Sequence, residues 1–197
     1  LWYYRLVSPG LLSRTILLSL DMHQGNMGIT SYHDSQSRPI NWPLLTGNYV
    51  AFYRSRNAEV NCMGNAFVYY ISFFSLILNL LFINFQKWDI SLRYIIGWCV
   101  SYFPFYLVPR SMFLYHYLIP LIFACCSTGA LVDRCPKRLL VGIFVVIISI
   151  LCLFGFYLWS PYSYGIPHLD SDITIWSSNW ISGDEYHRQL RRNQQKS

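Results

Sequence analysis

Charged side chains are scarce in this sequence of 197 residues. Only 12% of the residues are Asp, Glu, Lys or Arg, whereas a soluble domain carries about 25%. Hydrophobic residues make up 54% of the chain and aromatic residues 18%. The charges also cluster before Arg56 and after Asp170 and leave the middle of the chain to apolar runs. This shortage disfavours a water-soluble domain and indicates that lipid is the main solvent of the middle region.

Several motifs of soluble enzymes and nucleic-acid-binding proteins are also missing. The six cysteines form no Cys-x-x-Cys or Cys/His ligand spacing, so the sequence predicts neither a zinc site nor a disulfide framework. It contains no Gly-rich phosphate loop, no Ser/His/Asp or Cys/His nucleophile arrangement and no metal-binding cluster. The net charge is +6, and Lys and Arg flanking membrane spans explain it better than nucleic-acid binding does. We therefore expect no catalytic residue, metal, cofactor or nucleic-acid partner in this chain.

What the sequence does contain is four apolar runs that approach or reach the roughly 20 residues that a helix needs to cross a bilayer. Gly64–Phe85 and Leu139–Trp159 carry no charge, and Ser111–Val132 is similarly apolar. The shortest run, Leu92–Val108, contains Pro104, which predicts a kink because proline cannot donate a helical hydrogen bond. The sequence thus predicts an all-α membrane protein with four transmembrane helices.

Four short strings resemble the last membrane part of the protein O-mannosyltransferases. They are SRPINWP at 37–43, GNA at 64–66, FLYHYLIP at 113–120 and PYSYG at 161–165. The family usually has Pro where this chain has Ala66, which is a mild departure because Pro there mainly favours a helix start. The resemblance covers the chain from about Met22 to Trp180. It implies the C-terminal membrane part of a glycosyltransferase that moves mannose from dolichyl phosphate mannose to Ser/Thr hydroxyls of secretory proteins.

The resemblance also implies a multi-pass protein of the endoplasmic reticulum membrane, with a homologous mannosyltransferase subunit as a candidate dimer partner. The lipid-linked sugar is a substrate, so no cofactor is expected. The family's catalytic Asp-Glu pair lies in an early lumenal loop, and Asp184-Glu185 in the tail does not match that context. We therefore expect the chain to be a fragment that lacks the catalytic base. The alternative is a non-catalytic membrane scaffold or an orphaned fragment.

Three parts follow from composition and charge. Residues 1–63 are a lumenal or interfacial segment whose interrupted start, Leu1–Leu20, fits a truncated or amphipathic helix. Residues 64–159 are the four-helix region, and residues 160–197 are an aromatic tail. Most loop Lys and Arg lie between helices one and two and between helices three and four, so the positive-inside rule places those loops in the cytosol and both ends of the chain in the lumen.

Arg110 and His116 are the strongest site candidates. We expect Val108–Ser111 to be a tight link between antiparallel helices, with Arg110 at the lumenal membrane face and His116 just below it. Ionisable groups at that depth are costly and are functional candidates by default. A lipid phosphate needs such cationic or imidazole donors, and we add Tyr115 and Tyr117 to this candidate donor cavity. The alternative is that Arg110 extends to lipid headgroups while His116 makes one interhelical hydrogen bond.

Weaker candidates lie in the polar segment before the first span. His33, Arg38 and Trp42 are placed to contact donor or acceptor if the segment is lumenal. The alternative is a solvated loop, because loops are polar in any case. Within the first span, polar side chains at positions 72, 75 and 79 share one helical face. We expect that face to pack against another helix.

Overall fold

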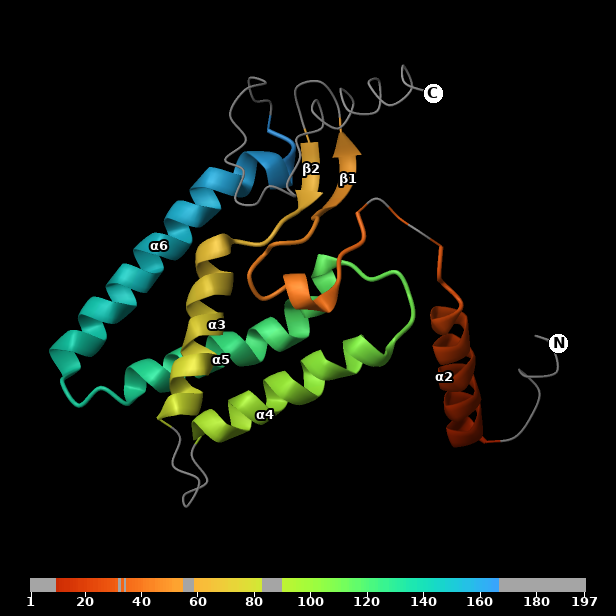
Figure 1. The fold of residues 1–197 in the computed structure, drawn as a ribbon, viewed down its shortest axis with the longest axis horizontal. Helices are drawn as coiled ribbons and strands as arrows, with labels where there is room; N and C mark the ends of the chain where they lie inside the picture. The colour runs from red at the N-terminus through yellow and green to blue at the C-terminus, as the bar shows by residue number, and fades with distance from the viewer. Residues whose placement is uncertain (1–9, 32, 34, 55–58, 83–89, 167–197) are drawn as a thin grey trace.

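The computed structural model describes residues 10–31, 33, 35–54, 59–82 and 90–166. Figure 1 shows the helices α3, α4 and α5 packed together, α6 leaning against them, and α2 standing apart. A β-hairpin and short 3-10 helices gather at one end of this bundle. The elements in chain order are α2 (Leu11–Met27), η1 (Pro39–Asn41), β1 (Val50–Arg54), β2 (Glu59–Cys62), α3 (Ala66–Leu81), α4 (Ile90–Tyr102), η2 (Phe103–Leu107), η3 (Leu114–Tyr117), α5 (Leu118–Asp133) and α6 (Arg138–Tyr164).

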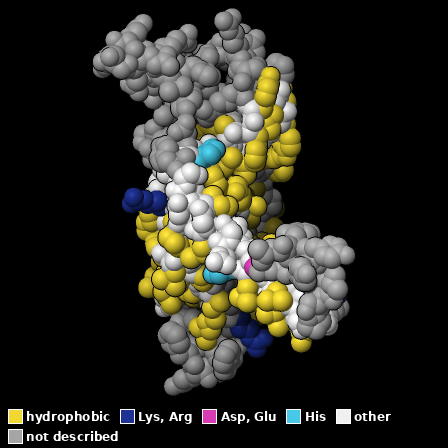
Figure 2. Space-filling model, turned by 90° about the vertical axis from the view of Figure 1, so that its right-hand side faces the viewer, with side chains coloured by type: hydrophobic (Ala, Val, Ile, Leu, Met, Phe, Trp, Pro, Cys, Tyr) yellow, Lys and Arg dark blue, Asp and Glu magenta, His cyan; other side chains and the backbone are white. Residues whose placement is uncertain are grey.

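Two helical stretches among the described residues are long and apolar enough to cross a membrane, Leu114–Asp133 and Arg138–Tyr164. The apolar helix α3 is shorter, at 16 residues. Many of the large apolar side chains of α6 are exposed, as expected of a helix that faces lipid. Figure 2, viewed from the side of α2, shows hydrophobic side chains over much of the described surface and only isolated charged ones.

Helix α3 is fixed against α6 by its N-cap. The Asn65 side-chain oxygen accepts a hydrogen bond from the Phe67 amide (3.1 Å), and its Nδ2 donates to the Cys152 carbonyl in α6 (2.8 Å). Gly155 lies at this contact, where an added Cβ would be 2.3 Å from the Asn65 oxygen. The close approach of the two helices therefore depends on a residue without a side chain.

The predicted shared face of α3 is confirmed. Ser72, Ser75 and Asn79 are all buried. Asn79 reaches α5, because its Nδ2 donates to the carbonyl (2.7 Å) and hydroxyl (2.8 Å) oxygens of Ser127. The hydroxyls of Ser72 and Ser75 donate to carbonyls of their own helix. This face packs helix on helix, as expected.

The prediction of an all-α protein was wrong in the segment before α3. Strands β1 and β2 form an antiparallel hairpin with Val50 opposite Cys62 and an irregularity between Ala51 and Tyr53. Val, Phe and Tyr favour extended backbone, and β2 packs against α6. Helix α2 also continues to Met27, beyond Leu20, where the predicted truncated or amphipathic helix ends.

The link between α4 and α5 is longer than predicted. The α-helical part of α4 ends at Tyr102 and continues as the 3-10 helix η2, which begins next to Pro104. Helix α5 begins at Leu118 and not at Ser111, after the 3-10 turn η3. Pro120 favours this start, because a proline ring is tolerated best in the first turn of an α-helix.

Helix α6 runs past the predicted end at Trp159 through Pro161 to Tyr164. Gly165 then ends the helix in the left-handed conformation, with φ of 68°, which glycine adopts without steric cost. The remainder of the predicted aromatic tail, with Asp170, Asp172 and the pair at 184–185, lies outside the described residues.

Candidate functional site

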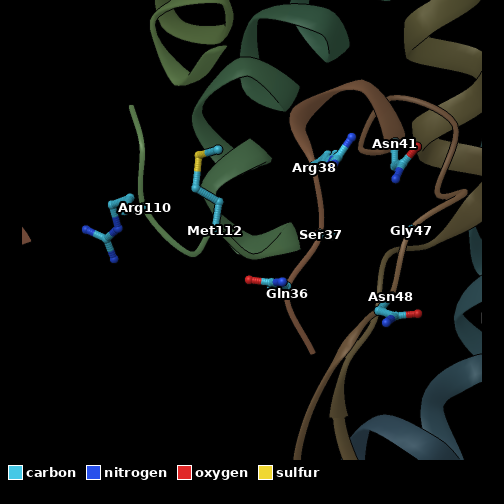
Figure 3. Close-up of a pocket in the computed structure, with 8 residues that line it drawn as sticks. All are labelled: Gln36, Ser37, Arg38, Asn41, Gly47, Asn48, Arg110 and Met112. Carbon is cyan, nitrogen blue, oxygen red and sulfur yellow. The ribbon is translucent and has the colours of Figure 1, made fainter. Parts of the chain in front are cut away.

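A polar cavity of about 490 Å3 opens between the segment 36–48 and the link 110–112, as Figure 3 shows. Among the described residues, its lining contains two arginines, three carboxamides and no carboxylate. The lining residues are Gln36, Ser37, Arg38, Asn41, Gly47, Asn48, Arg110 and Met112. Such a surface offers many hydrogen-bond donors and a positive charge, so it suits an anionic ligand that also carries hydroxyl groups.

Ser37 joins the two walls of the cavity. Its amide donates to the Met112 carbonyl (2.8 Å), and its hydroxyl accepts a hydrogen bond from Trp42 Nε1 (2.9 Å). The Trp42 side chain is fully buried. Gly47 lies against the same point, where an added Cβ would be 2.9 Å from the Cβ of Asn41 and 3.0 Å from that of Ser37. The wall formed by 36–48 is therefore held in one position by buried contacts.

The two arginines reach the cavity from different parts of the chain. Arg110 is half-buried and comes from the α4–α5 link, whereas Arg38 is exposed and directly precedes η1. In Figure 3 the side chain of Gln36 extends from its segment toward the side on which Arg110 lies. Arg110 donates from Nη1 to the Asn26 side-chain oxygen at 2.9 Å and from Nε to the Ser111 carbonyl at 3.4 Å. No ion pair of either arginine occurs within the described part of the chain.

A row of stacked aromatic rings connects Trp42 to the C-terminal part of the α4–α5 link. Trp42 stacks on His116 with 6.2 Å between ring centroids, His116 on Tyr115 at 4.5 Å and Tyr115 on Phe113 at 5.5 Å. His33 meets Phe113 edge-on at 5.2 Å. The Nδ1 atom of His116 lies 3.0 Å from the Phe113 carbonyl and 3.2 Å from its amide nitrogen. These contacts fix the orientation of the His116 ring.

The structure brings only some of the predicted candidates to the cavity. Arg110 and Arg38 line it. The aromatic row contains four others, Trp42, Tyr115, His116 and His33, of which the Tyr115 side chain is 39% exposed.

Tyr117 does not line the cavity and belongs to the buried core, where its ring centroid lies 6.4 Å from that of Trp42. It is fully buried, and its hydroxyl accepts a hydrogen bond from Trp98 Nε1 (3.0 Å). Direct contact with the lipid-linked sugar stays a prediction for five residues: His116, Tyr115, Tyr117, His33 and Trp42.

Four carboxamide side chains at or next to the cavity were not among the predicted site residues. Gln36, Asn41 and Asn48 line the cavity, and Asn26 holds Arg110 from the last turn of α2. Asn41 lies inside the string SRPINWP, so the resemblance pointed to its neighbourhood. Gln36 and Asn48 lie in polar sequence without a motif and are selected only by the contact between 36–48 and 110–112. Asn26, also without a motif, is selected by its hydrogen bond to Arg110.

Metal ligands do not gather in the part of the chain that the structure describes, where no group of three or more His, Cys, Asp or Glu side chains could hold an ion. The cavity lining is itself rich in cationic and amide donors. Such donors complement phosphate, sugar hydroxyls or a peptide backbone rather than a cation.

Comparison with known proteins places the chain in a family. Residues 11–183 match the C-terminal four TMM region of protein-O-mannosyltransferase. The chain belongs to this family. This confirms the predicted resemblance and the membrane character of the region.

Individual relatives are similar over most of this chain. Dolichyl-phosphate-mannose–protein mannosyltransferase 1 of Candida albicans is 28% identical over 72% of this chain and 19% of its own length. Mannosyltransferase 5 of the same organism is 27% identical over 79% of this chain and 26% of its own length. Protein O-mannosyl-transferase 1 of Danio rerio is 26% identical over 76% of this chain and 25% of its own length. The chain thus spans between 19% and 26% of the length of these relatives.

A solved structure has the same fold. In the Saccharomyces cerevisiae protein O-mannosyltransferase Pmt1-Pmt2 complex bound to the sugar donor, one chain superimposes with a TM-score of 0.71 and is 24% identical. The match covers 92% of this chain and 29% of that chain. The helices, hairpin and α4–α5 link therefore belong to an arrangement that a solved protein shares.

Proposed function

We propose that this chain is the donor-binding membrane part of a protein O-mannosyltransferase, and that its cavity receives the phosphate and sugar of dolichyl phosphate mannose. The observation that carries the proposal is the pair Arg38 and Arg110 in a cavity whose lining, in the part of the chain that the structure describes, contains no carboxylate. The names of the curated relatives specify this donor, and the solved relative is bound to a sugar donor.

The cavity has the composition that the polar end of such a lipid needs. A phosphate monoanion or diester is held best by guanidinium groups, which give short, charge-assisted hydrogen bonds. Gln36, Asn41 and Asn48 add amide groups that both donate and accept, as sugar hydroxyls do. The exposed apolar side chains of η2, including Leu107 at 83% exposure, offer a lipid-facing surface next to the link for the isoprenoid chain.

The orientation follows from the charges at the other end of the bundle. Lys137 is the N-cap of α6 there and Arg138 its first residue, and Arg134 donates from Nη1 to the Phe82 carbonyl (2.7 Å) and from Nη2 to the Ser91 hydroxyl (3.1 Å). The positive-inside rule assigns that end to the cytosol. The cavity then faces the lumen, and the endoplasmic reticulum is the expected compartment.

In the proposed reaction the acceptor Ser or Thr hydroxyl attacks the anomeric carbon of mannose with inversion. The new carbon–oxygen bond forms as the bond to the phosphate oxygen breaks, and dolichyl phosphate leaves. Arg38 and Arg110 stabilise the charge on this leaving group. The hydroxyl proton passes to a base outside this chain. A second mannosyltransferase subunit is the proposed partner, in line with the two-protein complex of the solved relative.

The test measures mannosyl transfer from dolichyl phosphate mannose to a Ser/Thr peptide. Membranes would contain this chain alone or with any sequence that precedes it in its transcript. We expect Arg110→Ala to raise the donor KM about ten- to hundredfold, the loss of one charged hydrogen bond. The donor KM of Arg110→Lys should lie between those of Arg110→Ala and the wild type, because lysine keeps the positive charge but loses the paired N–H donors of the guanidinium. Arg93→Ala, an exposed arginine near the start of α4, is the matched control.

Three outcomes would contradict the proposal. An unchanged donor KM in both Arg110→Ala and Arg38→Ala would remove the cavity from donor binding. Transfer by this chain alone would show that the base is present here after all. Correct insertion without transfer or donor binding in either form would identify a non-catalytic scaffold.

A further inference from the structure

Arg110 owes its position to a neutral partner. Its Nη1 donates to the Asn26 side-chain oxygen at 2.9 Å. The contact from Nε to the Ser111 carbonyl is long, at 3.4 Å, and therefore weak. A guanidinium has five N–H groups, so most of its donors stay available after these two contacts. Among the described residues, the strongest fixed contact of this cation is thus an amide from a distant part of the sequence.

The position of Asn26 is itself defined by the same link. The Ser111 amide donates to the Ile29 carbonyl at 3.0 Å, and the Ser111 hydroxyl donates to the Ser31 carbonyl. Helix α2 otherwise stands apart from the bundle (Figure 1). The C-terminal end of α2 is therefore attached to the cavity through 110–111, and Asn26 lies in its last turn.

The chemistry of the partner decides what Arg110 can bind. A carboxamide oxygen accepts a hydrogen bond but carries no net charge, so it orients the guanidinium and leaves the positive charge intact. A carboxylate in the same place would accept a stronger, charge-assisted hydrogen bond and neutralise the site. The two side chains have almost the same shape. They differ in the anion affinity that they leave to Arg110.

We propose that Asn26 is a positioning residue that holds Arg110 at the cavity without neutralising it, and thereby sets the affinity of the cavity for an anionic lipid headgroup. This inference rests on the proposed donor site. It adds α2, which the cavity lining itself does not include, to the elements that tune donor binding.

A purely structural role of Asn26 predicts a different result. If the contact only attached α2 to the link, a carboxylate would make the attachment stronger and leave ligand binding unchanged. Asn26→Asp therefore separates the two roles, because it keeps the shape and the contact but removes the net charge. Asn26→Ala removes the contact and leaves the charge.

The experiment measures the Kd of farnesyl phosphate, a short polyprenyl monophosphate, for the detergent-purified full chain, with farnesol as the uncharged control ligand. We expect Asn26→Asp to weaken farnesyl phosphate binding about tenfold, as a neutralised charge-assisted contact does. Asn26→Ala should weaken it about threefold, because an unrestrained guanidinium must be ordered on binding. Gln24→Glu is the matched control, since it adds the same charge to the last turns of α2 at a side chain that is exposed.

The double variant Asn26→Asp/Arg110→Ala should bind no more weakly than Arg110→Ala alone, because Asn26 acts through Arg110. Farnesol binding and Tm should stay near the wild type in Asn26→Asp, which shows that the protein is folded. Wild-type binding by Asn26→Asp together with weak binding by Arg110→Ala would overturn the role of Asn26 alone. Wild-type binding by Arg110→Ala would overturn the proposed donor site itself.

Discussion

Two regions of this chain are held together in different ways. One is the helical bundle α3–α6, and the other is the cavity end, formed by the segment 36–48 and the α4–α5 link. In the bundle, Gly97 of α4 lies under the Phe123 ring of α5 and Gly155 of α6 lies against Asn65, at distances that leave no room for a Cβ. At the cavity end, backbone and side-chain hydrogen bonds join distant segments, as when the Tyr102 hydroxyl donates to the Pro39 carbonyl at 2.8 Å. Small residues bring the helices together, and hydrogen bonds hold the irregular segments.

The difference follows from the solvent of each region. Lipid is as apolar as a leucine side chain, so helices in a membrane associate through close packing and a few polar contacts. Irregular backbone lacks the continuous hydrogen bonding of a helix or a sheet, so many of its polar groups must find other partners. The predictions below test this contrast in order of expected effect.

The largest effect should come from filling the α3–α6 contact. Gly155→Leu should lower stability by about 3 kcal/mol, the upper end for overpacking, or Tm by roughly 10 °C. Thermal unfolding of the detergent-purified protein measures it. Gly142→Leu on the same helix is the matched control, because an added Cβ there meets nothing within 4 Å. Equal Tm values for the two variants would mean that α6 does not pack on α3 at Gly155.

A smaller loss is expected at the cavity wall. Ser37→Ala leaves the buried Trp42 N–H without its acceptor, which costs about 1–3 kcal/mol and should lower Tm by about 4 °C. Ser35→Ala is the control, since that hydroxyl makes no hydrogen bond with the residues that the structure describes. A Tm that is the same in both variants would show that the wall is held by packing alone.

The smallest effect should come from the polar contact inside the bundle. Asn79→Leu removes the hydrogen bonds to Ser127, and such interhelical contacts in membranes average about 0.6 kcal/mol. The buried Asn79 oxygen has no hydrogen-bond partner among the described residues, so its removal offsets part of that loss. We expect a change in Tm of about 1–2 °C in the same assay. A decrease larger than that of Ser37→Ala would reverse the contrast between the two regions.

The sequence predicted the elements of the bundle better than those of the cavity end. The apolar runs indicated all four bundle helices, and Pro104, where a kink was predicted, lies in the 3-10 helix that follows α4. The hairpin at Val50 was missed because it is short and its strand pattern lies in mixed polar sequence. The link is longer than the predicted turn at Val108–Ser111, because the 3-10 helices η2 and η3 replace regular α-helix on both sides of it.

The same division holds for the site. Arg110 and Arg38 were predicted from their charge at a membrane face and from the resemblance, and both line the cavity. Asn26 and Gln36 carried no such signal, because a neutral amide in a polar segment is ordinary surface. Their selection needs the folded positions of three segments that are far apart in sequence.

The sequence by itself determined that this chain is a membrane region of the protein O-mannosyltransferase family, because apolar length and local strings are properties of neighbouring residues. The tertiary structure decided which polar side chains surround the cavity, and that Arg110 contacts Asn26 and, among the described residues, no carboxylate. Those contacts join segments as distant as α2 and the α4–α5 link, and only the folded backbone brings their side chains within hydrogen-bond distance.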